Sequence, residues 1–147
     1  MDESSIYKYK LLTENLATSG QPTQEELSLI SNAGYSVVIN LGLHNEEYSE
    51  KNEPLFFAGK NIKYIYIPVK FDEPKGKDLT AFTKAMDLHK DDKIFIHCAA
   101  NKRVSVFIAL YRTLSLGWPA EKAIKELKTV WLPNKIWQSF IDRQLTI

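Results

Sequence analysis

The sequence contains only one cysteine, Cys98, among its 147 residues. A lone thiol cannot form an internal disulfide, and it belongs to neither a C-x-x-C pair nor a cysteine–histidine cluster. The three histidines, His44, His89 and His97, are far apart and lack the spacing of metal ligands. We therefore expect no metal and no other cofactor.

Long apolar runs and an excess of one charge are missing as well. No segment approaches the roughly 20 apolar residues that span a bilayer, and the amino terminus does not resemble a signal peptide. The formal net charge is +1, which offers no basic surface for nucleic acid. We expect neither nucleic acid nor membrane as a partner. The default location is cytoplasmic, or periplasmic if a leader has been removed.

What is present is an ordinary globular composition, with 44% hydrophobic and 25% charged residues. The length is typical of one domain, which we expect to span residues 1–147. The run at residues 37–41, apolar but for Asn40, predicts a strand covered on both faces, and residues 62–69 and 93–97 predict two further strands. Helices are expected after Thr23, where Glu26 completes a capping box, and over about 46–60, after Asp78, over about 104–116, from Pro119, and around 136–141. This alternation predicts an α/β domain with a mainly parallel central sheet and helices on both faces.

Two further expectations concern the first half of the chain. The acidic residues Glu46, Glu47, Glu50 and Glu53 are interpreted as the solvated face of a polar helix. Residues 7–12 and 16–18 are interpreted as antiparallel edge strands.

The candidate site follows the third predicted strand, in the segment Cys98 to Arg103. Open parallel sheets bind ligands at the carboxyl ends of their strands, and unpaired N–H groups at a helix start favour anions. Small side chains at Ala99 and Ala100 let a ligand approach the backbone, and Asn101 suits a positive φ. Lys102 and Arg103 add positive charge, which favours the thiolate form of a cysteine, the nucleophilic form. The alternative is a buried cysteine that only packs.

The segment Ile96-His97-Cys98-Ala99-Ala100-Asn101-Lys102-Arg103-Val104-Ser105 resembles the signature loop of the protein tyrosine and dual-specificity phosphatases. Supporting segments are Ser19-Gly20-Gln21-Pro22, Val38-Ile39-Asn40-Leu41, Ile67-Pro68-Val69 and the pair Trp131 and Trp137. Together they are similar to the small bacterial phosphatase-like domains of the β-lactamase-hydrolase-like type. The resemblance covers roughly residues 16–140.

The resemblance implies a mechanism and roles for individual residues. Cys98 would be the nucleophile that attacks phosphorus, with His97 as a structural neighbour that favours its thiolate. Asp72 would protonate the leaving oxygen, with Glu73 and Asp78 as rivals for that role. Ser105 would help the thiolate leave. The anion would be held by Ala99, Ala100, Asn101, Lys102, Arg103 and Val104.

The sequence departs from this signature at the position of its arginine, which here holds Val104. The nearest arginine, Arg103, comes one residue earlier. Three outcomes remain open. Arg103 turns inward and the protein is an altered phosphatase, or Val104 lies inward and the loop binds anions with little turnover. The third is a rhodanese-like sulfurtransferase, because a cysteine followed by four residues and an arginine resembles that family.

We therefore predict a cysteine-dependent phosphatase acting on a phosphorylated small molecule or a phosphoprotein. The loop is expected to hold phosphate or sulfate. The alternatives are a catalytically degenerate phosphate-binding module and a sulfurtransferase.

Overall fold

The computed structural model describes residues 1–146. At its centre is a five-stranded sheet in the order β1-β2-β5-β3-β4. Its strands are β1 (Lys10–Thr13), β2 (Leu16–Ser19), β3 (Val37–Asn40), β4 (Lys63–Tyr66) and β5 (Ile94–His97). Only β1 runs antiparallel to its neighbour, β2; the other neighbouring strands are parallel. The predicted α/β class with a mainly parallel sheet is confirmed.

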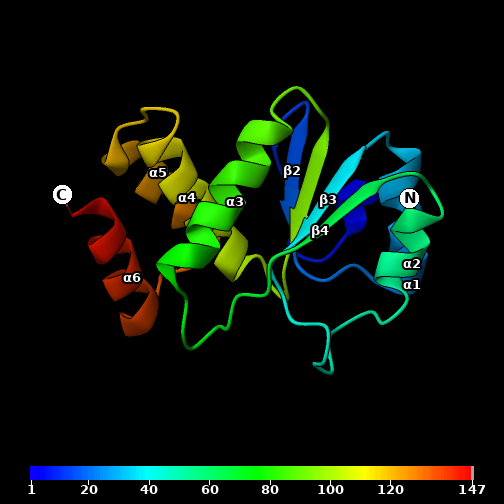
Figure 1. Ribbon diagram of the computed structural model, residues 1–147, viewed down its shortest axis with the longest axis horizontal. Helices are drawn as coiled ribbons and strands as arrows, with labels where there is room; N and C mark the ends of the chain where they lie inside the picture. The colour runs from blue at the N-terminus through cyan, green and yellow to red at the C-terminus, as the bar shows by residue number, and fades with distance from the viewer. Residues whose placement is uncertain (147) are drawn as a thin grey trace.

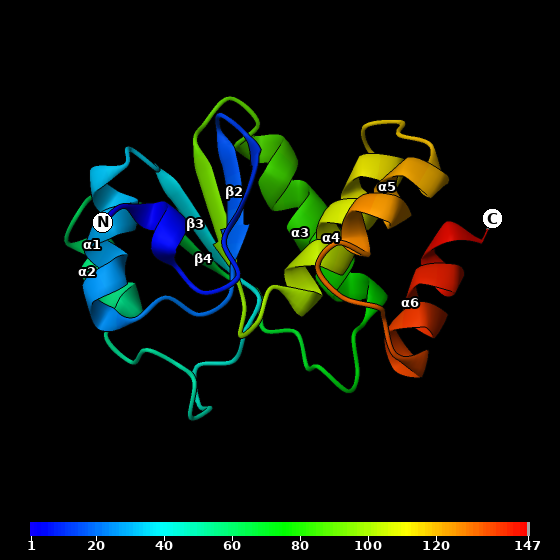
Figure 2. The same cartoon turned by 180° about the vertical axis from the view of Figure 1, so that it is seen from behind.

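Helices cover both faces of this sheet (Figure 1, and from behind in Figure 2). One side carries α1 (Gln24–Asn32), α2 (Glu53–Ala58) and the short 3-10 helix η1 (Glu3–Ser5). The other carries α3 (Gly76–Leu88), α4 (Lys102–Leu114), α5 (Ala120–Leu127) and α6 (Lys135–Leu145). The two layers arise because alternate side chains of a strand point to opposite faces.

Strands β3 and β5 are buried on both faces, as predicted for residues 37–41, whereas β4 lies at the edge of the sheet with exposed and half-buried side chains. In β5, Ile94 and Ile96 belong to the core beneath α4, whereas Phe95 belongs to the core beneath α1. Helix α4 packs between the sheet and the other helices of its layer, and ten consecutive residues from Arg103 to Arg112 are buried. The site at the start of α4 therefore rests on the most enclosed helix of the fold.

Two expectations about the first half of the chain were wrong. The segment around 46–60 is not one helix: α2 begins only at Glu53, with Pro54 in its first turn, where a missing N–H costs no hydrogen bond. Strand β2 is not at an edge, because it pairs with β1 on one side and with β5 on the other. A strand this short shows its place in a sheet only through its tertiary partners.

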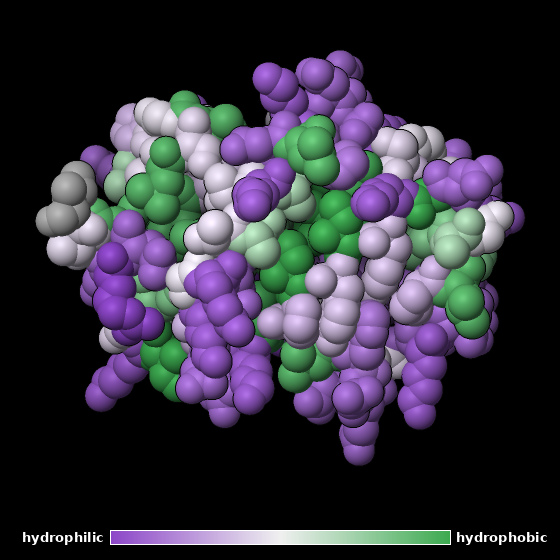
Figure 3. Space-filling view, viewed as in Figure 1, coloured by the Kyte–Doolittle hydropathy of each residue, from purple (hydrophilic) through white to green (hydrophobic). Residues whose placement is uncertain are grey.

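The exposed surface is mixed in character. Figure 3 shows one face on which hydrophilic side chains dominate the lower edge and apolar side chains form separate patches. Within residues 1–146, no helix combines the length and apolar character that crossing a membrane requires. The same residues include no group of three or more metal-ligating side chains.

Candidate active site

The loop from Cys98 to Asn101 joins β5 to α4 at the carboxyl end of the parallel strands. Asn101 has φ 62°, the left-handed conformation expected for it, and α4 begins at the next residue. Its side-chain amide donates to the backbone oxygen of Lys8 at 3.0 Å and to Thr18 Oγ1 at 3.0 Å. Asn101 thus anchors the loop from behind to β2 and to the segment before β1.

Unbonded backbone N–H groups concentrate along this loop. The N–H groups of Ala99, Ala100 and Lys102 to Val104 donate to no acceptor within residues 1–146. Ala99 and Ala100 are also partly exposed. Such groups at the start of a helix favour a bound anion, because they combine unpaired donors with the positive end of the helix dipole.

Gly20 and Gln21 support the loop from the side. The backbone N–H of Gln21 donates to the oxygen of Ala99 at 3.0 Å. A Cβ atom on Gly20 would lie 2.6 Å from that same oxygen, so only glycine permits this approach. The Ser19-Gly20-Gln21-Pro22 segment therefore contacts the loop directly.

Arg103 and Val104 point in different directions. Val104 has no exposed surface and lies in the core. Arg103 lines a cavity of about 770 Å³, and its guanidinium donates to the oxygen of Val69 at 2.8 Å and to Tyr48 Oη at 3.3 Å. Of these two residues, only Arg103 lines the cavity, and its side chain is 4% exposed.

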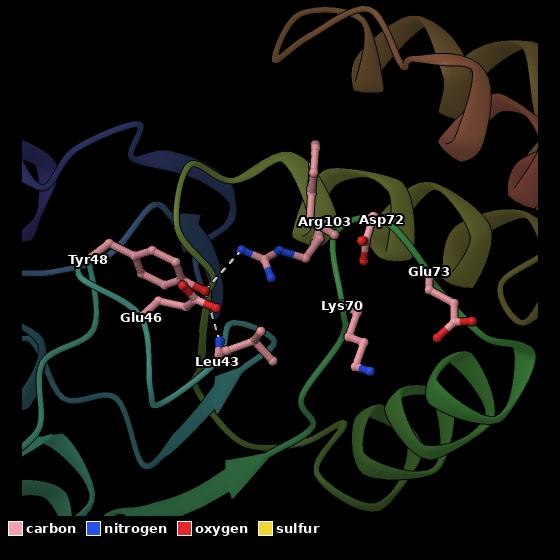
Figure 4. Close-up of a pocket in the computed structure, with 8 residues that line it drawn as sticks. Leu43, Glu46, Tyr48, Lys70, Asp72, Glu73 and Arg103 are labelled. Atoms are coloured by element: carbon pink, nitrogen blue, oxygen red, sulfur yellow. Dashed lines mark hydrogen bonds between the residues drawn. The ribbon is translucent and has the colours of Figure 1, made fainter.

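The segment after β4 forms the opposite wall of this cavity (Figure 4). Lys70, Phe71, Asp72 and Glu73 line it, and all four are exposed. Leu43, Glu46 and Tyr48 complete it from the segment after β3. Asp78 lies elsewhere: its carboxylate accepts the N–H of Lys75 at 3.2 Å and caps α3. The structure thus brings Asp72 and Glu73 to the same cavity as Arg103.

Cys98 and Ser105 have less accessible positions. Cys98 has no exposed surface and contributes to the core beneath α4. The hydroxyl of Ser105 donates to the oxygen of Lys102 at 2.8 Å and accepts from Trp131 Nε1 at 3.1 Å. It therefore already has two partners, neither of which is the thiol.

A buried ion pair joins Glu53 and His97, and no sequence pattern predicts it. Their exposed fractions are 1% and 0%, and Nε2 of His97 bonds Oε2 of Glu53. Burial raises the pKa of Glu53, but the His97 ring and hydrogen bonds from His97, Gln21 and Tyr64 hold it below its usual value. The expectation that Glu53 is solvated was wrong, because α2 begins there and the buried carboxylate bonds His97 and Gln21. Nothing in its sequence context distinguishes it from Glu46, Glu47 or Glu50.

The contact between Tyr48 and Arg103 is likewise not predicted by the sequence. The Tyr48 hydroxyl accepts from the backbone N–H of Leu43 at 2.9 Å as well as from Arg103. A single tyrosine in a polar segment carries no signal of such a role.

Comparison with known proteins identifies relatives of this arrangement. No family model matches the sequence. The β-lactamase hydrolase-like protein of Xylella fastidiosa (strain Temecula1 / ATCC 700964) is 28% identical over 102 residues, which is 67% of this chain. The matched segment is only 23% of that protein.

Solved structures extend the likeness over nearly the whole chain. A candidate phosphatase from Shewanella putrefaciens CN-32 is 29% identical, with a TM-score of 0.83, and covers 96% of this chain and 93% of its own. The catalytic core of a PP-IP phosphatase from S. cerevisiae, in complex with citrate, is 23% identical, with a TM-score of 0.73, over 93% of this chain and 85% of its own. The resemblance to the β-lactamase-hydrolase-like type is confirmed, and the chain shares its fold with the two phosphatase structures.

Proposed function

Because the chain shares its fold with cysteine-dependent phosphatases, we propose that it hydrolyses a phosphomonoester at the Cys98 loop. The observation that carries the proposal is the shared cavity of Arg103 and Asp72, next to a loop with unbonded N–H groups. A cation and backbone donors suit a phosphoryl group, and a carboxylic acid nearby suits its leaving oxygen.

The proposed reaction has two steps. The Cys98 thiolate attacks phosphorus and forms a sulfur–phosphorus bond, while the bond to the leaving oxygen breaks and Asp72 gives that oxygen its proton. A water molecule then attacks phosphorus, its proton passes to the Asp72 carboxylate, and the sulfur–phosphorus bond breaks to release inorganic phosphate. Arg103 and the loop N–H groups offset the charge that accumulates on the phosphoryl oxygens.

Ser105 keeps a role in this proposal as the hydroxyl that assists release of the thiolate. Its hydrogen is bonded to the oxygen of Lys102, so it must exchange this partner during the reaction. The remaining anion-binding residues contribute differently. Ala99, Ala100 and Lys102 contribute unbonded N–H groups. Asn101 holds the loop by its side-chain hydrogen bond to Lys8, and Val104 holds it by packing in the core.

A second candidate is a phosphate-binding module without turnover. The observation that favours it is the complete burial of Cys98, since a nucleophile must reach its substrate. The ligand class is the same in both cases, a phosphorylated small molecule or a phosphoprotein. A sulfurtransferase is less well supported, because the structural relatives described above are phosphatases or candidates for that activity.

One experiment separates these candidates. Hydrolysis of p-nitrophenyl phosphate is measured for the wild type, Cys98→Ser and Arg103→Ala, with binding of inorganic phosphate measured by calorimetry in parallel. A phosphatase loses turnover in both variants, and Cys98→Ser still binds phosphate. Phosphate binding without turnover in the wild type would favour the binding module and reject the enzyme.

A further inference from the structure

Both ring nitrogens of His97 face oxygen atoms, and the lowered pKa of Glu53 keeps its carboxylate an acceptor at neutral pH. Nε2 faces the Glu53 carboxylate, and Nδ1 lies 3.3 Å from the backbone oxygen of Cys98. A neutral imidazole has one donor and one acceptor nitrogen, so it cannot satisfy two acceptors. A ring protonated at both nitrogens would donate to both oxygens, and the Glu53 carboxylate would balance its charge.

The bond from His97 determines the direction of the next N–H group. All peptide bonds within residues 1–146 are trans, so the oxygen and the hydrogen of each peptide point in opposite directions. Because the Cys98 oxygen is directed at His97, the N–H of Ala99 points away from the ion pair. That N–H is one of the unbonded donors of the loop.

The same argument applies to the following peptide through Gln21. The backbone N–H of Gln21 holds the oxygen of Ala99, so the N–H of Ala100 also points away. The side chain of Gln21 donates to Oε1 of Glu53 at 2.9 Å. The two residues that hold two consecutive carbonyl groups of the loop thus bind the two oxygens of one carboxylate.

We propose that Glu53 is a positioning residue which, through His97 and Gln21, aims the N–H groups of Ala99 and Ala100 at the bound anion. It touches no reacting atom. The inference rests on the proposed function only in taking the Cys98 loop as the anion site, and it holds whether or not the anion is hydrolysed.

Other titratable groups surround this pair. Cys98 follows His97 in the chain, and Tyr64 approaches from β4, where its hydroxyl bonds Asn40 and His44. Burial and the Glu53 charge raise the pKa of Tyr64, so its hydroxyl stays protonated at neutral pH. Besides the Cys98 thiolate of the proposed reaction, the Glu53 carboxylate is the negative charge next to His97 among these groups.

The first test measures the protonation of His97 in the full chain by 15N NMR of the three imidazole rings from pH 6 to 8. We expect both nitrogens of His97 to be protonated throughout in the wild type, and one to lose its proton in Glu53→Gln. A neutral His97 in the wild type would overturn the proposal, even if no variant folds.

The second test is binding of inorganic phosphate. Glu53→Gln is expected to weaken it by about 10- to 100-fold, by analogy with the loss of the outer partner of a metal-bound imidazole. Glu53→Asp, which keeps the charge, should recover part of the loss. Glu47→Gln removes an exposed charge outside the cavity and is the matched control. Wild-type affinity in a folded Glu53→Gln would refute the positioning role, whereas phosphate binding without turnover would refute only the proposed hydrolysis.

Discussion

The guanidinium of Arg103 donates through Nη2 to the phenol oxygen of Tyr48 at 3.3 Å. The two residues come from opposite ends of the site: Arg103 from the first turn of α4, and Tyr48 from the segment that follows β3. Since the same oxygen accepts the N–H of Leu43, Tyr48 couples the shape of its own segment to the position of the arginine.

Arg103→Ala is expected to lower kcat/KM for p-nitrophenyl phosphate by about 100- to 1000-fold, the usual loss when one preorganised donor is removed from a transition state. Arg103→Lys should recover little, because lysine lacks the planar fork that binds two oxygens at once. Steady-state kinetics on both variants provide the measurement. Full activity in Arg103→Ala would mean that the phosphoryl group is bound elsewhere.

Tyr48→Phe is expected to have a milder effect in the same assay. The variant removes the acceptor of one hydrogen bond from Arg103 but leaves the bond that Arg103 donates to the Val69 oxygen in place. We expect kcat/KM to fall by about tenfold, the effect of roughly one hydrogen bond to a charged group. The same loss should be absent when Tyr48→Phe is made in an Arg103→Ala background, since the partner is then already missing.

Alanine variants of Asp72 and Asp78 show which of the two residues acts as the general acid. Asp72→Ala should lower hydrolysis of an alkyl phosphate by about 100-fold, the contribution of a general acid. Its effect on p-nitrophenyl phosphate should be smaller, because that leaving group departs readily without a proton. Asp78→Ala should leave both rates unchanged and cost about 1 kcal/mol of stability, because it removes a cap of α3. If Asp78→Ala lowered hydrolysis of the alkyl phosphate and Asp72→Ala did not, Asp78 would be the general acid.

A variant at Val104 tests whether residue 103 or residue 104 of the loop faces the cavity. Restoring an arginine there, as Val104→Arg, should not increase activity, because the side chain points into the core. An unpaired charge at a fully buried position should instead destabilise the fold by about 3 to 5 kcal/mol. Urea unfolding measures this loss. A stable Val104→Arg with higher activity would show that residue 104 can reach the cavity.

Acid should weaken the fold through Glu53. Its pKa in the folded protein lies below its usual value of 4.5, so the carboxylate stabilises the native state above pH 4.5. That contribution is lost as the pH falls through the folded pKa. The free energy of unfolding, measured in urea between pH 3 and 7, should therefore fall at the acid end. In Glu53→Gln it should start lower and depend less on pH; an unchanged acid slope would contradict this assignment.

Local chemistry explains which parts of this structure could be predicted. The apolar runs, the capping box at Thr23 and the left-handed Asn101 are determined by neighbouring residues, and all are present. Arg103, the arginine nearest the position that the signature assigns, and Asp72, in a loop after a strand, line the same cavity.

Residues whose role depends on tertiary contacts could not be predicted in this way. Glu53 lies among acidic neighbours and becomes buried only because α2 begins there, and Tyr48 meets Arg103 only across the cavity. The direction of Val104 likewise depends on how the first turn of α4 faces the core. In each case the deciding partner is far away in the sequence.

Cys98 is the only thiol of the chain, and it has no exposed surface. Any thiol reagent that modifies this protein must therefore wait until the loop opens. If closing is fast compared with the chemistry, the rate of modification reports the equilibrium between closed and open loop, as hydrogen exchange does for amides. The protein thus contains its own probe of local opening at the site where a ligand would bind.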